Sequence, residues 1–314
     1  MQTIENTGPR HEVKVDLIAV VGAVIGAQPT VLTIREGSAL PSGPFELGHR
    51  SLQAGLRNWV EQQTGHPLGY IEQLYTFADR DRIADERARR AISISYLGLT
   101  RDDSSAGERS RDWRSWYGYF PWEDHRTAPP PVIADIILPR LAEWCGSAGA
   151  ATKEERWHRA ALSFGLEGRP WNEELVLQRY ELLYEAGLVP EALRDHGTRQ
   201  EPPVPGREMM GDHRRILATG IARLRTKIKY RPVVFELMPP AFTLLQLQRT
   251  VEALAGRLVH KQNFRRLIEQ QELVEETGET TSETGGRPAK LFRFRPGVLM
   301  ERTAAGTKIP SARA

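Results

Sequence analysis

The sequence predicts an α+β protein with three regions, and two observations support this prediction. Strand-like and helical stretches alternate over the first 126 residues, whereas the remainder is mainly helical until two short strands near its end. The net charge also differs between the two parts of the chain. Residues 1–206 carry 23 Lys and Arg against 29 Asp and Glu, a balance of −6, and residues 207–314 carry 20 against 11, a balance of +9. We therefore expect domains at 1–126, 127–207 and 208–314.

The composition is that of an ordinary globular chain. Its 314 residues suffice for two or more domains, and 40% are hydrophobic and 26% charged. Cys145 is the only cysteine, which excludes an intrachain disulfide and a cysteine-rich metal site and fits a reducing cytosol. The most apolar run, 17–27, has eleven residues, against the roughly 20 that a membrane helix needs, and it lacks a basic leader. We expect a cytoplasmic protein without a membrane partner.

In the first region, each element is assigned from its residue pattern. VKVDLIAVVGAVI and TVLTIRE are rich in Val and Ile and predict strands. Residues 52–64 predict a helix, because apolar residues recur at core-facing spacing and Gly65 is a stop signal. EQLYTFADRD and RAISISYLGLT predict two further strands, and WRSWYGYFPW predicts an aromatic one. This order favours a layered domain of sheet and helices.

The second region is predicted to be helical. Three prolines at 129–131 precede ADIILPRLAEW, and TKEERWHRAALSFG and WNEELVLQRYELLYEAGLV predict two further helices with aromatic residues on their apolar faces. EPPVPG, at 201–206, is typical of a linker. No catalytic spacing is present, so we interpret the Trp and Tyr residues here as packing residues.

The third region begins with a long helix from Gly211 to about Tyr230, followed by a short strand, VVFEL. A second helix then starts at the capping-box spacing of Thr243 and Gln246, and it ends before a glycine turn. The next helix covers about 261–271. At 100° per residue, its apolar residues fall on one face and its Gln and Arg residues on the other.

A helix, a turn and a helix with an outer Gln and Arg face is the arrangement that reads the major groove of DNA, because Arg matches guanine edges and Gln matches adenine. ELVEET and RPAKLFRFRP predict two strands with a Gly-rich tip, which completes a winged helix-turn-helix. The alternative is a small helical domain with solvated charges. Glu279 and Glu283 would repel phosphates, so we expect the wing to contact DNA through its later half. The candidate DNA-binding residues are Thr243, Gln246, Lys261, Gln262, Asn263, Arg265, Arg266, Gly286, Arg287 and Lys290.

The stretch LPSGPFELGHRSLQAGLRNWVEQQTG, residues 40–65, resembles the signature of the Nudix hydrolases, G-x5-E-x7-R-E-U-x-E-E-x-G-U. Leu40, Pro41 and Gly43 fit its loop, and Arg57 takes the place of its Arg. Gly65 falls one place late. The metal-binding carboxylates are mostly replaced, by His49, Asn58 and Gln62, while Glu61 remains and Glu46 lies nearby.

Diphosphate cleavage needs a divalent metal held by oxygen ligands, and an amide is a poor substitute for a carboxylate. We therefore expect neither a catalytic residue nor a catalytic metal site, and no hydrolysis. The sequence predicts a Nudix-like α/β/α sandwich, a helical insert and a C-terminal winged helix-turn-helix domain.

This combination resembles the Nudix-related transcriptional regulators of NAD metabolism, the NrtR and NadQ types. The resemblance lies in these sequence segments: TFADRDR, RAISISYLGL, the Nudix-like stretch 40–65, and DHRRILATGIARLRTKIKYRPVVFELMPPAFTLLQLQ through GGRPAKLFRF. The length and added helices resemble the NadQ type more than the shorter NrtR type. The resemblance implies a bacterial repressor of NAD-biosynthesis genes that binds a palindromic operator as a homodimer. It also implies an adenine nucleotide effector: ADP-ribose in the shorter members, or NAD or ATP.

The candidate effector residues follow from the chemistry of a nucleotide diphosphate. Guanidinium groups bind phosphate bidentately, and an aromatic ring can stack on adenine. The residues are Arg57, Phe77, Arg80, Arg82 and Arg90. Ordinary strand-end charges and a core Phe are the alternative. Two other function classes stay open. A hydrolase with a second, regulatory function would turn over ADP-ribose with divalent metal, and a protein-interaction adaptor would show no salt-dependent DNA binding.

Overall fold

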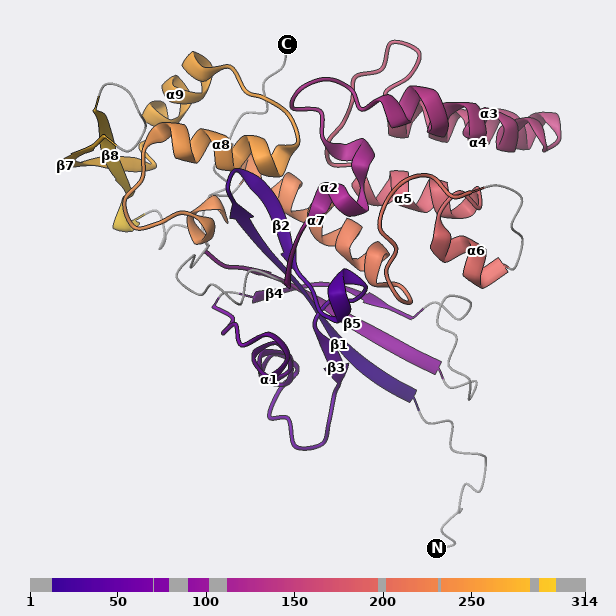
Figure 1. Cartoon of the computed structure of the whole chain (residues 1–314), viewed down its shortest axis with the longest axis horizontal. Helices are drawn as coiled ribbons and strands as arrows, with labels where there is room; N and C mark the ends of the chain where they lie inside the picture. Colours follow the sequence, from indigo (N-terminus) through magenta and orange to yellow (C-terminus); the bar gives the residue numbers. More distant parts are fainter. Residues whose placement is uncertain are drawn as a thin grey trace, which may run out of the picture.

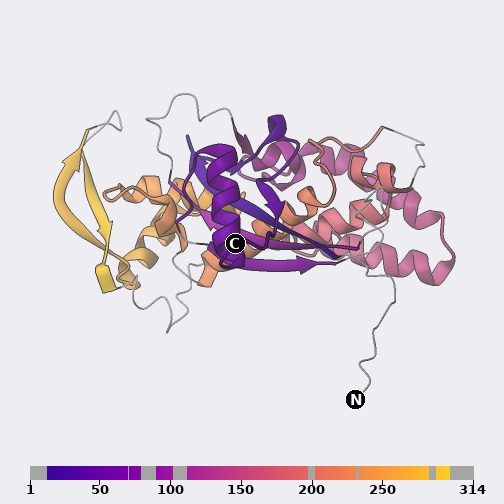
Figure 2. The same ribbon diagram turned by 90° about the horizontal axis from the view of Figure 1, so that it is seen from below.

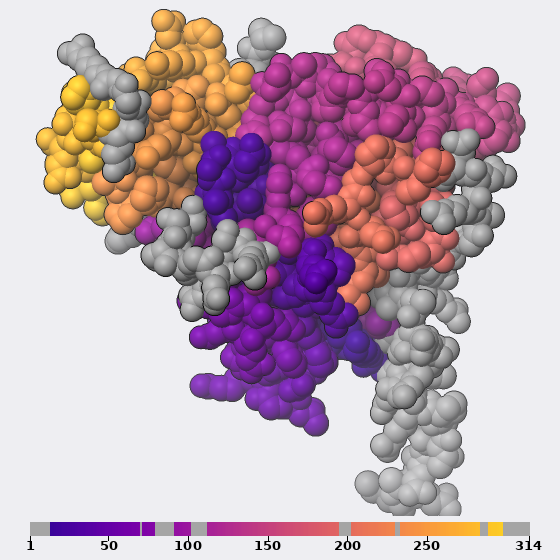
Figure 3. Space-filling view, viewed as in Figure 1, coloured from indigo at the N-terminus to yellow at the C-terminus, as the bar shows by residue number. Residues whose placement is uncertain are grey.

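The structure, a computed structural model, describes residues 13–69, 71–78, 90–101, 112–196, 202–230, 233–282 and 288–297. A sheet lies in the middle of the molecule. A helical region lies toward one end of the long axis and a two-stranded hairpin at the other (Figures 1 and 2). In the space-filling view, the helical region and the C-terminal elements form one broad side, and the sheet domain lies below them (Figure 3). No helix among the described residues is long and apolar enough to cross a membrane.

The sheet contains six strands within the described residues, in the order β4-β5-β1-β2-β6, and β3 pairs with β1. The pairing of β1 with β5 is parallel, and the other pairings are antiparallel. The strands are β1 (Val13–Ile25), β2 (Gln28–Leu32), β3 (Ser42–Pro44), β4 (Ile71–Phe77), β5 (Arg90–Leu99) and β6 (Trp113–Ser115).

The two faces of the sheet pack against different helices, as the alternation of β1 dictates. Leu17 and its same-face neighbours pack with Leu56 and Val60 of α1 (Leu52–Thr64). Ile18 and Val20 belong to the opposite core, which includes α7 (His213–Tyr230). This arrangement confirms the predicted α/β/α sandwich.

Helix α7 lies unusually close to the sheet at one point. A Cβ atom on Gly220 would lie 2.8 Å from Cγ1 of Val20, so only glycine permits this approach. The helix therefore forms part of the sandwich. It also contacts α8, the first helix of the C-terminal unit.

The helical region consists of η4 (Ile133–Ile137), α3 (Leu138–Gly146), α4 (Ala150–Phe164), α5 (Val176–Glu185) and α6 (Pro190–His196). The helices predicted in 127–207 are thus confirmed, and α6 is an addition to them. Helix α5 packs on α7, so this region shares the large core of the sandwich.

The prediction of one aromatic strand over WRSWYGYFPW was wrong. After the three-residue β6, the chain forms α2 (Trp116–Tyr119) and the turn η3 (Pro121–Glu123). Four of the aromatic residues are buried, two of them adjacent, and a strand would have pointed neighbours to opposite faces. The Ser115 hydroxyl accepts a hydrogen bond from the Tyr117 backbone N–H at 3.3 Å and so starts α2.

Two further strand predictions need correction. The strand over TVLTIRE ends at Leu32; Ile34 is still extended, and the chain then turns in η1 (Arg35–Gly37), where Arg35 and Glu36 have φ of 52° and 58°. VVFEL forms the 3-10 turn η5 (Val233–Leu237), in which four of five residues are buried. A strand would have turned about half of them outward.

The C-terminal unit has the predicted winged helix order: α8 (Leu244–Ala255), α9 (Lys261–Gln270), β7 (Val274–Thr281) and β8 (Ala289–Phe294). The predicted capping box is present: Thr243 Oγ1 accepts from the Gln246 N–H, and the Gln246 side chain accepts from the Thr243 N–H. The Phe294 ring packs against Phe235 and Phe242, with centroids 3.6 and 4.5 Å away, so the hairpin is anchored on the unit's core.

Candidate functional site

Helix α9 presents the polar face that the sequence predicted. Phe264 and Ile268 are 4% and 1% exposed and fix the inner face of the helix. The exposed residues of the helix include Lys261, Gln262, Asn263, Arg265 and Arg266, together with the acid Glu269. The first five side chains are cationic or carry amide groups, which are the types that bind phosphates and base edges.

Two predicted DNA-binding residues at the start of α8 have structural roles. Thr243 is 2% exposed and its hydroxyl is used in the capping box. Gln246 is exposed, although its side chain oxygen accepts from the Thr243 backbone. A DNA contact by either residue stays a prediction.

The described part of the wing carries its charge as cross-strand pairs. Lys290, predicted to contact phosphate, is 2.8 Å from a Glu276 carboxylate oxygen. Two similar pairs, each at 2.7 Å, join Glu275 to Arg293 and Glu272 to Arg295. Gly286 and Arg287 lie outside the described residues. The charges of the described wing strands are thus largely balanced, whereas α9 exposes Lys261, Arg265 and Arg266.

In the Nudix-like loop and helix, His49, at the first carboxylate position, packs against the helix and hydrogen-bonds within the loop. His49 Nδ1 accepts a hydrogen bond from the Glu46 N–H at 3.1 Å, and the ring lies so close to Gly55 that a Cβ there would be 2.6 Å from Nδ1. The neighbouring Gln63 holds β3 from both sides: its Nε2 donates to the Ser42 carbonyl at 2.8 Å, and its Oε1 accepts from the Ser42 N–H at 3.1 Å.

Three other box positions point to solvent. Asn58, Glu61 and Gln62 are exposed on α1. Within the part of the chain that the structure describes, no three His, Cys, Asp or Glu side chains are grouped so as to hold a metal ion. The arrangement offers hydrogen-bonding amides where a hydrolase needs anionic ligands.

The predicted effector residues do not form one described cluster. Arg57 donates to the Leu68 carbonyl and holds the loop that follows α1. Phe77 is 2% exposed, and the Arg215 guanidinium lies 4.9 Å above its ring, so it is a core residue in this conformation. Arg90 begins β5. Arg80 and Arg82 lie outside the described residues.

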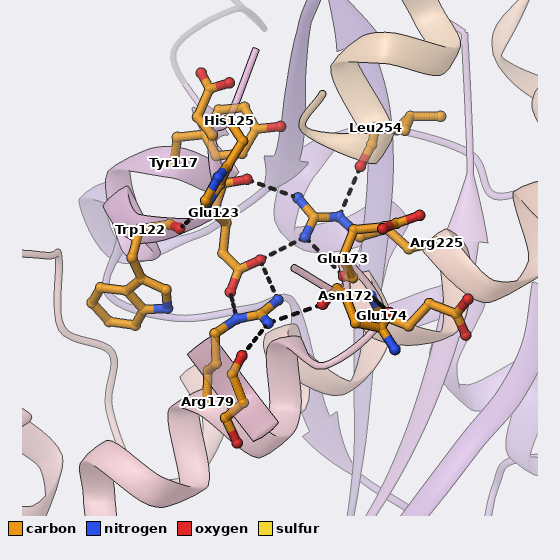
Figure 4. A network of polar contacts seen from close by, with 12 residues as sticks. Tyr117, Trp122, Glu123, His125, Asn172, Glu173, Glu174, Arg179, Arg225 and Leu254 are labelled. Atoms are coloured by element: carbon orange, nitrogen blue, oxygen red, sulfur yellow. Dashed lines mark hydrogen bonds and ion pairs between the residues drawn. The ribbon is translucent and has the colours of Figure 1, made fainter. Parts of the chain in front are cut away.

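A buried ionic junction, which sequence reasoning missed, joins the sheet domain, the helical region and the winged helix (Figure 4). The carboxylate of Glu123, 2% exposed, lies between two buried guanidinium groups. Its Oε1 accepts from Arg179 Nε at 2.5 Å, and its Oε2 accepts from Arg225 Nη1 at 2.6 Å. Burial alone would raise the pKa of Glu123. The two arginines outweigh that effect and lower the pKa, so the carboxylate stays ionised.

The same junction holds the end of α8. Arg225 Nε donates to the Leu254 carbonyl at 2.9 Å. The Tyr117 hydroxyl donates to the Ala253 carbonyl at 2.7 Å, and burial raises the pKa of Tyr117 to about 12, so this hydroxyl stays a donor. The last turn of α8 is therefore bound to residues of the sheet domain and of α7.

The turn after α8 completes the connection. Gly256 has φ of 73°, and a Cβ there would lie 2.4 Å from the Glu123 carbonyl oxygen, so the turn needs glycine. Its own carbonyl accepts from the His125 N–H at 2.7 Å. Arg257 pairs with Glu173 of the helical region at 3.2 Å.

One sequence signal would have revealed this junction. Arg225 follows the spacing of the buried residues Ile221, Leu224 and Ile228, which places a cation on the apolar face of α7. Arg179 occupies the equivalent kind of position on α5. A charged residue on such a face needs a buried partner, and Glu123, within an aromatic stretch, is the acid that provides it.

Comparison with known proteins places these features in a family context. Residues 234–294 match the family model of the NrtR DNA-binding winged helix domain. Over 83 residues the chain is 41% identical to the ADPR responsive transcriptional repressor NtrR of Acinetobacter baylyi, which is 26% of this chain and 33% of that protein. The chain thus matches about a third of the length of this curated relative.

Solved structures extend the likeness to the whole fold. Shewanella oneidensis NrtR complexed with a 27mer DNA matches with a TM-score of 0.54 and 20% identity, over 94% of this chain and 99% of that chain. The same protein without DNA matches with a TM-score of 0.51, 19% identity, and coverage of 94% and 98%. The resemblance to NrtR-type chains and the α+β fold with a C-terminal winged helix are confirmed.

Proposed function

We propose that this chain is a DNA-binding transcriptional repressor of the NrtR type, acting in the cytoplasm, whose sheet domain binds an adenine nucleotide. The proposal rests mainly on α9, which lies inside the segment that matches a DNA-binding winged helix. This helix exposes Arg, Lys, Gln and Asn side chains. The name of the Acinetobacter relative favours ADP-ribose as the effector, with NAD and ATP as the other candidates. NAD-biosynthesis genes, a palindromic operator and a homodimer belong to the same proposal.

The DNA-binding part is tested with duplex DNA selected by the full chain from a random-sequence library. We expect selection of a defined site, and an affinity for it that falls steeply with salt because phosphate neutralisation releases counterions. A chain that selects no sequence, or whose affinity ignores salt, would be a protein-interaction adaptor instead.

We also propose that the sheet domain does not hydrolyse nucleotides. His49 and Gln63 are used for packing, and Asn58 and Gln62 carry no charge. We expect no turnover of ADP-ribose with Mg²⁺ or Mn²⁺ above a protein-free blank, measured by chromatography of the products. Turnover that disappears in Glu61→Gln would favour the alternative, a hydrolase with a second, regulatory function.

We keep residues 1–126, 127–207 and 208–314 as the proposed domains, with one change that concerns α7. Helix α7 lies on the sheet, and the family match begins at residue 234, after it. We therefore assign α7 to both units: it receives the nucleotide signal from the sheet domain and delivers it to the winged helix.

A further inference from the structure

Helix α9 carries one acidic side chain in its outermost row. At about 100° per residue, Gln262, Arg266 and Glu269 all lie within about 40° of the direction opposite the buried Phe264. All three are exposed. The row runs about 10.5 Å along the helix, which equals about three base-pair steps of duplex DNA. A helix that enters a groove with this row therefore carries Glu269 in with it.

The Glu269 carboxylate is not neutralised by its neighbours on the helix. Arg265 and Arg266 lie four and three residues before it, which is the spacing of helical ion pairs. Among the residues that the structure describes, however, none forms an ion pair or a hydrogen bond with this carboxylate. The next glutamate, Glu272, is engaged, because its carboxylate lies 2.7 Å from Arg295. Glu269 thus presents a free anion within the DNA-binding surface.

The stability of the helix does not account for an acid at this position. Glu269 lies in the last turn of α9, where the partial negative charge of the helix C-terminus disfavours a carboxylate. In a groove, the phosphates would repel it as well, unless it meets a hydrogen-bond donor. The major groove offers donors at cytosine N4 and adenine N6, but adenine N6 lies beside the N7 acceptor of the same base, which a carboxylate cannot serve.

We propose that Glu269 reads a cytosine: its carboxylate accepts a hydrogen bond from the 4-amino group of the base in the major groove. The inference rests on the proposed function and adds to it a specificity-determining residue of opposite charge. Arg266 lies about 4.5 Å earlier along the helix axis, so the cytosine should lie within about two base pairs of the position that Arg266 reads. The same carboxylate acts against wrong sites, because guanine and thymine present only acceptor atoms there.

The test compares the base preferences of the wild-type full chain and of Glu269→Gln, by fluorescence anisotropy on the selected site and its single-base variants. We expect Glu269→Gln to prefer adenine where the wild type prefers cytosine, because the amide matches the adenine edge. The ratio of the two affinities should change about 5- to 100-fold. Glu269→Asp should keep the cytosine preference in a weaker form, since it retains the charge on a shorter side chain.

The matched control is Glu272→Gln, which removes the same charge from a glutamate that is paired with Arg295. It should raise the affinity for all duplexes alike, because less negative charge faces the phosphates, and leave the base preferences unchanged.

A second measurement needs no protein variant. Replacing the cytosine by 2-pyrimidinone removes its 4-amino group and should weaken wild-type binding about 5-fold or more. The same replacement at a cytosine elsewhere in the duplex is the control for the weakened base pair.

The outcomes separate this inference from the proposed function. If Glu269→Gln raises the affinity for every duplex by the same factor as Glu272→Gln, with unchanged base preferences, Glu269 is a solvated acid. The inference is then wrong, while the proposed regulator stands. If the wild type selects no sequence, the proposed function fails, and this inference fails with it. Wild-type affinity that is unchanged by 2-pyrimidinone at every cytosine of the site would overturn the cytosine contact even if Glu269→Gln fails to fold.

Discussion

Arg266 is the single side chain on which the reading of DNA is best tested. It is exposed on α9, and Phe264 and Ile268 fix the helix from the opposite side, so its removal leaves the fold intact. We expect Arg266→Ala to cost about 1–3 kcal/mol on the selected site and to relax the preference at one base pair. Binding to a panel of single-base variants measures both effects. Arg169→Ala, on the helical region, is the control, and a result equal to that control would mean that α9 does not read bases.

His213 gives the chain a defined pH dependence. Burial and Arg35 lower its pKa to about 4, and its Nδ1 accepts from the Leu40 N–H at 2.9 Å. The unfolded chain, with an ordinary histidine pKa near 6.5, binds a proton first as the pH falls. This residue therefore removes stability progressively between about pH 6.5 and 4, by about 3 kcal/mol at most, and has no effect above that window. Urea unfolding at pH 7 and 4.5 measures the loss. In His213→Gln, the loss of stability between pH 7 and 4.5 should be smaller. An unchanged pH dependence would show that His213 is not the group responsible.

At the scale of elements, the buried junction sets how firmly the winged helix is held. Glu123→Gln leaves Arg179 and Arg225 without their shared anion in a site where each is at most 2% exposed. We expect a loss of about 3–5 kcal/mol in the free energy of unfolding, because breaking a buried ion pair strands the remaining charge. Glu185→Gln removes an exposed partner of Arg159 and should cost about 0–1 kcal/mol. Equal losses in the two variants, measured by urea unfolding, would show that the junction is not a structural anchor.

Elements with a clear period could be predicted from the sequence, and elements set by tertiary packing could not. Helix α1, its glycine stop and the capping box of α8 depend on local chemistry, and they are as predicted. The buried aromatic residues before Glu123 do not alternate along the chain, and VVFEL is buried at four of its five positions, so neither segment has a period that distinguishes strand from turn. Arg114 and Arg207 lie far apart in the sequence, yet both approach Gly37, and only the folded chain brings them together.

At the scale of the molecule, the two binding events should be linked through α7. We expect the nucleotide and the operator to alter each other's affinity by the same factor, on the order of 1–3 kcal/mol in coupling free energy. Calorimetric titration of ADP-ribose with and without saturating operator gives one side of the cycle, and anisotropy titration of operator with and without ADP-ribose gives the other. Tyr117→Phe removes one hydrogen bond between the sheet domain and α8 without stranding a charge, and it should reduce the coupling. Independent binding of the two ligands would deny the sheet domain a sensing role.

The paired charges of the wing have a consequence for how such a protein finds its operator in a genome. Lys290, Arg293 and Arg295 each face a glutamate, so we expect the described part of the hairpin to add little attraction to DNA of arbitrary sequence. Attraction of that kind is what holds a protein on the vast excess of competing sites. If the chain binds DNA as proposed, we expect the described wing strands to contribute little to its dwell time on wrong sites. We expect these glutamates to lower non-specific affinity, so that the ratio of specific to non-specific binding depends mainly on base contacts.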